Sequence, residues 1–211
     1  VTGASIWGGK TWNARLAVFD GDTGELKKSV DLATSMDSTC RPVYADGIIV
    51  IPLAGGALQA VSAKTLETIW YVPATGGQSL SSLTVDSGYV YAATLLKFGE
   101  KQDAYKAVSG AVRRYNLKTG ALAATYANDE AGYYWAGGVV VNGYYVVGDD
   151  SGCVKALDAN LSVVSSVKVA DGYLRTALVE HDGYLYAVSR DDGVLHKLLI
   201  SSTGELSEAG K

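Results

Sequence analysis

Apolar residues in this chain gather in short runs, and turn-forming pairs separate one run from the next. The clearest example is the segment 138–164, which reads GVVVNGYYVVGDDSGCVKALDANLSVV. Its first two apolar runs are joined by Asn142-Gly143, and this pair predicts a β-hairpin because a type I′ turn needs two residues that tolerate positive φ. A third strand is expected to end at Asp158, directly before another turn.

The same design recurs along the chain. The residues that align in the turn before each last strand lie 42, 54, 42 and 42 residues apart, and they are Thr23, Thr65, Thr119, Leu161 and Thr203. A period near 42 that carries four short strands is typical of a β-propeller blade. We therefore expect one all-β domain over 1–211, a β-propeller of four-stranded antiparallel blades. Its five blade-like units span about 1–34, 35–75, 76–127, 128–170 and 171–211.

The expected second strands of the units, such as YVYAA, YYVV and YLYAV, are apolar at nearly every position. A strand has this pattern when both of its faces are covered. Stacked blades provide such cover, because each blade packs between two neighbours. The first unit supplies strands at 4–9, 14–20 and 25–32 and lacks an innermost one. The sequence leaves open a closed five-bladed ring or an arc of a larger propeller.

The third strand and its turn resemble the repeat of pyrroloquinoline-quinone (PQQ) type propellers, which read Ala-x-Asp-x-x-Thr-Gly with a Trp five residues after the Thr. Only Trp70 occupies the Trp position here. The matching segments are VFDGDTG (18–24), AVSAKTLETIW (60–70), YNLKTG (115–120), ALDANLS (156–162) and LISSTG (199–204). Quinoprotein dehydrogenases of this type carry a Cys-Cys pair and a calcium-bound quinone. The chain has no Cys-Cys pair, so the resemblance implies the branch without a cofactor.

Charge and composition narrow the classes of partner. The net charge is −4 and no basic run exceeds Arg113-Arg114, whereas nucleic acids and anionic membranes need clustered Lys and Arg. No apolar stretch approaches the roughly 18 residues of a membrane helix. Cys40 and Cys153 lie in different units and are expected to be unpaired core residues. The chain opens without Met, so we expect other domains in a longer parent chain.

Several apparent catalytic motifs are better explained as turns. Asp22-Thr23-Gly24 spells the aspartic-protease triplet, but Thr-Gly recurs at the same phase in 118–120 and 202–204. A Gly that accepts positive φ explains all three. Asp20 begins a calcium-loop-like string without the full pattern, and we expect its side chain to cap the turn backbone.

The remaining acids and histidines also suggest no catalytic, metal or cofactor site. Asp149-Asp150 and Asp191-Asp192 precede Gly in matching loops, where a solvated turn is expected. The two histidines, His181 and His196, are too few and too far from other candidates to predict a zinc or nucleophilic triad.

A binding site is expected on the rim that holds the loops between blades. Aromatic rings beside hydrogen-bonding groups suit sugars, peptides or protein surfaces. The same rim receives a 12-residue insertion at about 96–109, and long loops on rigid frames often carry function. The alternative, that the aromatic residues only pack between blades, stays open. The candidate ligand-binding residues are Arg41, Phe98, Tyr105, Tyr133, Tyr134, Trp135, Tyr173 and Arg175.

The sequence therefore predicts a non-enzymatic module that binds a protein or carbohydrate surface ligand through its aromatic rim. The resemblance implies a bacterial cell-surface or secreted location. Two alternatives remain: a hydrolase or lyase that acts on polysaccharide, and a purely structural scaffold domain of a larger surface protein.

Overall fold

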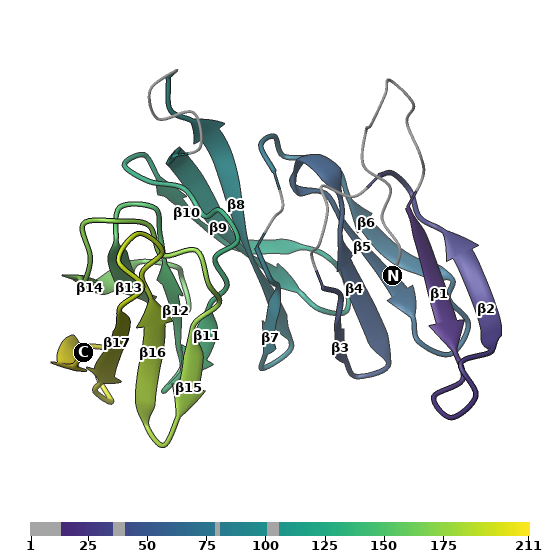
Figure 1. Cartoon of the computed structure of the whole chain (residues 1–211). Coiled ribbons are helices and arrows are strands. Elements are labelled where there is room, and N and C mark those ends of the chain that lie inside the picture. Colours follow the sequence, from purple (N-terminus) through teal and green to yellow (C-terminus); the bar gives the residue numbers. More distant parts are fainter. Residues whose placement is uncertain (1–13, 36–40, 79–80, 101–105) are drawn as a thin grey trace.

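The computed structural model describes residues 14–35, 41–78, 81–100 and 106–211, whose strands form five consecutive antiparallel sheets (Figure 1). Four sheets have four strands and the first has two. The chain passes through the strands of each sheet in sequence order, so each four-stranded sheet is a meander. The described residues hold one helical element, the short 3-10 turn η1 (Ala54–Gly56). The all-β blade architecture predicted from the repeat is confirmed.

The strands divide into five groups along the chain, one for each sheet. Unit 1 holds β1 (Arg15–Phe19) and β2 (Leu26–Asp31); unit 2 holds β3 (Val43–Ala45), β4 (Ile48–Pro52), β5 (Leu58–Ser62) and β6 (Thr68–Val72); unit 3 holds β7 (Thr84–Asp86), β8 (Tyr89–Phe98), β9 (Ala107–Asn116) and β10 (Leu122–Asn128); unit 4 holds β11 (Val139–Val141), β12 (Tyr144–Gly148), β13 (Cys153–Leu157) and β14 (Val163–Lys168); unit 5 holds β15 (Val179–His181), β16 (Tyr184–Val188), β17 (Leu195–Ile200) and β18 (Leu206–Gly210). The strand expected at 4–9 lies outside the described residues.

Two kinds of turn fix the register within each blade. Asn142 and Gly143 both adopt positive φ, 52° and 82°, as the type I′ turn between β11 and β12 requires. The turn between the third and fourth strands is capped by the side chain that begins it. Asp20 Oδ1 accepts hydrogen bonds from the backbone N–H groups of Asp22 and Thr23, both at 2.9 Å. The predicted capping role of Asp20 is thus confirmed.

Successive residues of a second strand pack against different neighbours. In β12, Tyr145 and Val147 contact unit 3, whereas Val146 contacts unit 5. In β8, Val90 contacts unit 2 and Tyr91 contacts unit 4. This two-sided burial explains why these strands are apolar at nearly every position.

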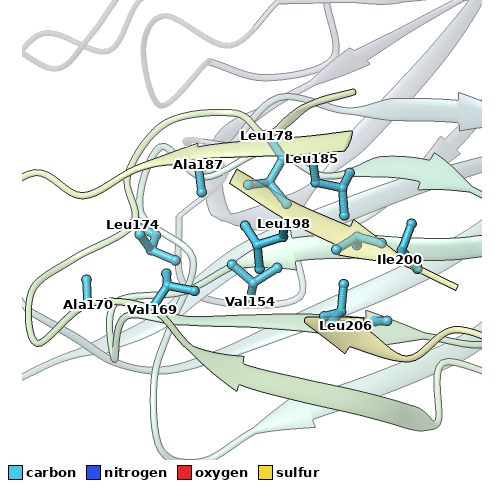
Figure 2. Packing of buried hydrophobic residues seen from close by; sticks show 12 residues of the cluster. Val154, Val169, Ala170, Leu174, Leu178, Leu185, Ala187, Leu198, Ile200 and Leu206 are labelled. Atoms are coloured by element: carbon cyan, nitrogen blue, oxygen red, sulfur yellow. The ribbon is translucent and has the colours of Figure 1, made fainter. Parts of the chain in front are cut away.

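The apolar clusters lie between blades. Figure 2 shows the cluster between units 4 and 5, in which Val154 on β13 lies beside Leu198 on β17. Leu206 on β18 and Leu185 on β16 extend the cluster to further strands of unit 5. An isolated blade would expose such a face, so each unit depends on its neighbours for stability.

The insertion in unit 3 mainly lengthens the hairpin formed by β8 and β9. β8 and β9 have 10 residues each, whereas β12 and β13 have 5 each. Ala107 and Ser109, which were predicted to lie in an inserted loop, belong to β9 and pair with Phe98 and Lys97, respectively. The hairpin consequently extends beyond the neighbouring blade (Figure 1).

The five units form an open arc in the described residues. The innermost strands β3, β7, β11 and β15 contact one another in that order. The two ends of the arc, β1–β2 and β15–β18, lie on opposite sides of Figure 1. No hydrogen-bonded pairing joins these two sheets within the described part of the chain. Cys153 is a free thiol, and Cys40 lies outside the described residues.

Candidate binding surface

Three consecutive aromatic residues in the loop between β10 and β11 have different environments. Tyr133 is fully buried, Tyr134 is half-buried and Trp135 is 44% exposed. Asn128 Nδ2 donates a hydrogen bond to the Tyr133 hydroxyl at 3.3 Å, and burial raises the pKa of Tyr133 well above its usual value. Tyr133 therefore packs between blades, and of the three rings only those of Tyr134 and Trp135 reach the surface.

Trp135 is held in an unusual backbone conformation. Its φ is 60°, in the left-handed region that bulky side chains rarely adopt and that costs about 1–2 kcal/mol. Its ring stacks on Tyr134 with centroids 4.2 Å apart and an interplanar angle of 28°. Phe98, at the end of the lengthened β8, meets Tyr134 edge-on at 5.4 Å. The insertion thus contributes one ring to this cluster.

Arg175 packs on the rings of both Tyr134 and Tyr173. Its guanidinium carbon lies 4.5 Å from the Tyr134 ring centroid and 4.3 Å from that of Tyr173. Arg190 lies 5.8 Å from the Tyr173 ring centroid. Planar groups therefore follow one another across two inter-blade loops, and a cation between two rings adds electrostatic attraction to the packing. We call Phe98, Tyr134, Trp135 and Tyr173 the aromatic stack.

Asp150 fixes the position of the Arg175 guanidinium through two hydrogen bonds. Arg175 Nε and Nη2 donate to Asp150 Oδ1 and Oδ2 at 2.9 and 2.6 Å, a bidentate pair. The N–H of Ala107 also donates to Asp150 Oδ2, at 2.7 Å. Burial raises the pKa of Asp150 above its usual value. Arg175, predicted to meet a ligand, is itself buried, and its charge is compensated by the carboxylate.

The solvated turn expected for Asp149-Asp150 is wrong, because both residues are buried, with 1% and 2% of their surface exposed. Asp149 forms an ion pair with Lys155 and accepts a hydrogen bond from Asn128 Nδ2 at 3.1 Å. Its N–H and carboxylate also anchor the tight turn that leads to β13. Asp191 and Asp192, in the matching loop of unit 5, are exposed as expected.

The other predicted residues lie elsewhere or cannot be placed. Arg41 is exposed and precedes β3 in unit 2, whereas the aromatic stack is built from units 3 and 4 and the loop that leads into unit 5. Tyr105 lies outside the described residues. Sequence reasoning missed Asp150 as the partner of Arg175, although both were noted separately, because 25 residues separate them.

Sequence reasoning also missed a polar relay in unit 5. His196 Nε2 lies 3.3 Å from Ser189 Oγ, and His196 Nδ1 lies 3.3 Å from Glu208 Oε1. This order of groups resembles a nucleophilic triad, but Ser189 and His196 are both buried. Ser189 also donates its hydroxyl proton to Asp192. A substrate cannot reach such a serine, so the relay satisfies polar groups inside the blade.

Comparison of the sequence with family models and curated proteins gives no match. No family model matches the sequence, and no curated protein matches it. Among the described residues no helix has the length and apolar character needed to cross a membrane.

Solved structures do match. The computationally designed Ika8 protein aligns with a TM-score of 0.66 and 14% identity over 86% of this chain and 51% of its own. The computationally designed Ika4 protein aligns with a TM-score of 0.61 and 14% identity over 79% of this chain and 96% of its own. BamB from Moraxella catarrhalis covers 88% of this chain and 76% of its own at 20% identity and a TM-score of 0.40. The chain spans about half of the first of these proteins. Its blade topology and the alignments with the two designed proteins identify the fold as a β-propeller.

Proposed function

We propose that this chain is a non-enzymatic binding module that holds a carbohydrate on the aromatic stack. Sugar rings present flat C–H faces that pack on aromatic rings, and their hydroxyls need neighbouring polar groups. The stack offers both, because half-buried rings of Tyr134 and Tyr173 stand beside exposed Trp135 and Arg190. A flat protein epitope is the competing ligand, and the experiment below separates the two.

The conformation of Trp135 carries the proposal. A large apolar ring at positive φ and 44% exposed opposes both backbone preference and the hydrophobic effect. Strained, exposed residues of this kind concentrate at functional sites, where surrounding structure holds them in place. The buried pair of Asp150 and Arg175 is that support, because it fixes the cation on which Tyr134 rests.

The repeat is proposed to be of the PQQ-like type without a cofactor. Besides the turn sequences, Trp70 supports this assignment. Its Nε1 donates to the Leu117 carbonyl of the next unit at 2.8 Å, and a Cβ at Gly120 would meet its ring at 2.8 Å. A bacterial cell-surface or secreted location, within a longer parent chain, follows from the resemblance and is part of the proposal.

A glycan array of bacterial surface polysaccharides tests the ligand class. A sugar that binds is then titrated while the fluorescence of the tryptophans is followed. Replacing Trp135 by Ala removes a ring of the stack, and a central aromatic contact contributes about 2 kcal/mol. We expect the dissociation constant of the sugar to rise about 30-fold.

Two controls keep the result specific. Tyr44→Ala removes an exposed ring from β3, far from the stack in sequence and in another unit, and should leave the affinity unchanged. The melting temperature of Trp135→Ala should stay within a few degrees of wild type. A large fall in melting temperature indicates that the ring only packs between blades. An array without any binding, together with capture of a protein ligand, refutes the carbohydrate assignment.

A further inference from the structure

Every junction between neighbouring units buries the same position of the later unit. The residue that immediately precedes the turn cap on the third strand packs against the unit before it. The residues at this position in units 2 to 5 are Val61, Tyr115, Leu157 and Ile200, between 0% and 7% exposed. In unit 1 the residue is Phe19, and 55% of it is exposed.

The first three junctions also share a polar contact, and a different side chain makes it each time. The earlier unit donates a hydrogen bond to a backbone carbonyl in the capped turn of the later unit. Lys28 donates to the Thr65 carbonyl, Trp70 to that of Leu117, and Arg114 to that of Ala159 at 2.8 Å. Arg114 also lies 3.5 Å above the Tyr89 ring of its own blade.

Unit 5 presents the same kind of face with nothing packed on it in the described residues. The residue two before the cap is Ala60 in unit 2 and Ala156 in unit 4, both fully buried, whereas in unit 5 it is Leu199, which is 42% exposed. Val179 and Leu195 are exposed as well. Lys197 lies 3.6 Å above the Tyr184 ring, an arrangement like that of Arg114 on Tyr89.

Within the described residues, the exposed faces of unit 1 and unit 5 match the two halves of one junction. Unit 5 has the apolar face and a cation, and unit 1 has the exposed Phe19 beside a capped turn. That turn carries Asp20, Asp22 and Glu25. Lys27 pairs with Asp20, so Asp22 and Glu25 supply the charge opposite to that of Lys197. The two faces lie on opposite sides of the arc (Figure 1), so they do not cover each other within one chain.

We propose that the face of unit 5 docks on unit 1 of a second copy of this chain. The contact is head to tail and continues the interface that already joins each unit to the next. Phe19 of one copy fills the place against unit 5 that Ile200 fills against unit 4. Lys197 meets the acidic turn, and a chain of such contacts leads to closed rings or to longer assemblies.

Sedimentation velocity of the 211-residue chain at several concentrations tests this proposal. We expect a concentration-dependent shift from monomer to dimer or larger species. Leu199→Lys and Phe19→Lys each place a charge in the apolar contact, and each alone should give only monomer. Both residues are exposed, so circular dichroism should show an unchanged fold. Leu122→Lys, which alters an exposed leucine on the outer strand of unit 3, is the matched control and should associate like wild type.

Mixing the two variants identifies the faces. The Leu199→Lys chain keeps an intact unit 1 and the Phe19→Lys chain keeps an intact unit 5, so an equimolar mixture should form a one-to-one complex. A wild-type chain that is monomeric at every concentration overturns the proposal. Dissociation by Leu199→Lys but not by Phe19→Lys also overturns it, because unit 5 faces then pair with each other.

Discussion

Replacing Arg175 by Met should destabilise the protein strongly. The change keeps most of the side-chain volume and removes the charge that Asp150 binds through two hydrogen bonds. Asp150 is 2% exposed, so its carboxylate then lies buried, and among the described residues the Ala107 N–H is its remaining donor. Removing one partner of a buried ion pair typically costs about 3–5 kcal/mol. At an m-value of about 2 kcal/mol/M, the urea midpoint should fall by roughly 1.5–2.5 M.

Two further variants show whether the uncompensated charge is the cause. Arg190→Met removes an exposed arginine that lies over the same Tyr173 ring, and this control should change the free energy of unfolding by less than about 0.5 kcal/mol. Asp150→Asn combined with Arg175→Met removes both charges and keeps an acceptor for Ala107. The double variant should recover more than half of the stability that Arg175→Met loses.

The pH dependence gives an independent check. Burial raises the pKa of Asp150 above its ordinary 3.8, so the folded state binds the proton more strongly than the unfolded chain. A carboxyl of this kind favours the folded state below 3.8 and loses that contribution as the pH rises through the folded pKa. Without Arg175 this effect grows, and the deficit of Arg175→Met should shrink as the pH falls toward 4. A deficit below 1 kcal/mol at pH 7, or one independent of pH, refutes the reasoning.

Three further predictions concern the turns and the junctions. Gly120→Ala places a Cβ 2.8 Å from the Trp70 ring at a φ of 70°. The change should lower the free energy of unfolding, measured by urea denaturation, by about 1–3 kcal/mol. An unchanged urea midpoint shows that the Trp70 contact is dispensable. Trp70→Phe leaves the Leu117 carbonyl without its donor and should cost about 1–3 kcal/mol, whereas Tyr71→Phe on the same strand should cost almost nothing. Lys27 and two backbone N–H groups lower the pKa of Asp20 to about 2. The stabilising contribution of Asp20 is therefore complete above pH 3.8 and is lost as the pH falls toward 2. Carboxyl-detected NMR should report this pKa, and Lys27→Ala should raise it.

The blades were predictable because their signals are local. The pair Asn142-Gly143 requires positive φ at both residues, and the structure has it. β12 is apolar at nearly every position, and this pattern indicates a strand whose two faces are both covered, as the packing of Val146 and Val147 against different units shows. Turn caps such as Asp20 need only the two or three residues that follow them. The pattern of the strands and the residues of the turns were therefore sufficient to predict most of the architecture.

The interior of the candidate site was not predictable in the same way. Tyr133, Tyr134 and Trp135 are adjacent in the sequence and show no periodicity, so the pattern does not indicate that Tyr133 is buried and Trp135 is exposed. Asp150 was expected in solvent because it precedes Gly in a loop, and its partner Arg175, 25 residues away, leaves no local signal. Long-range pairing between loops determines the burial of such residues, and the sequence contains no local pattern for it.

The use of Lys28, Trp70 and Arg114 for equivalent contacts has a consequence for assembly. Identical repeats can dock on the wrong neighbour, and misassembly between like units is a common failure of repeat proteins. Here an ammonium, an indole and a guanidinium of different reach make this contact at three successive junctions. We expect these differences to favour the native order of the blades over a shuffled one.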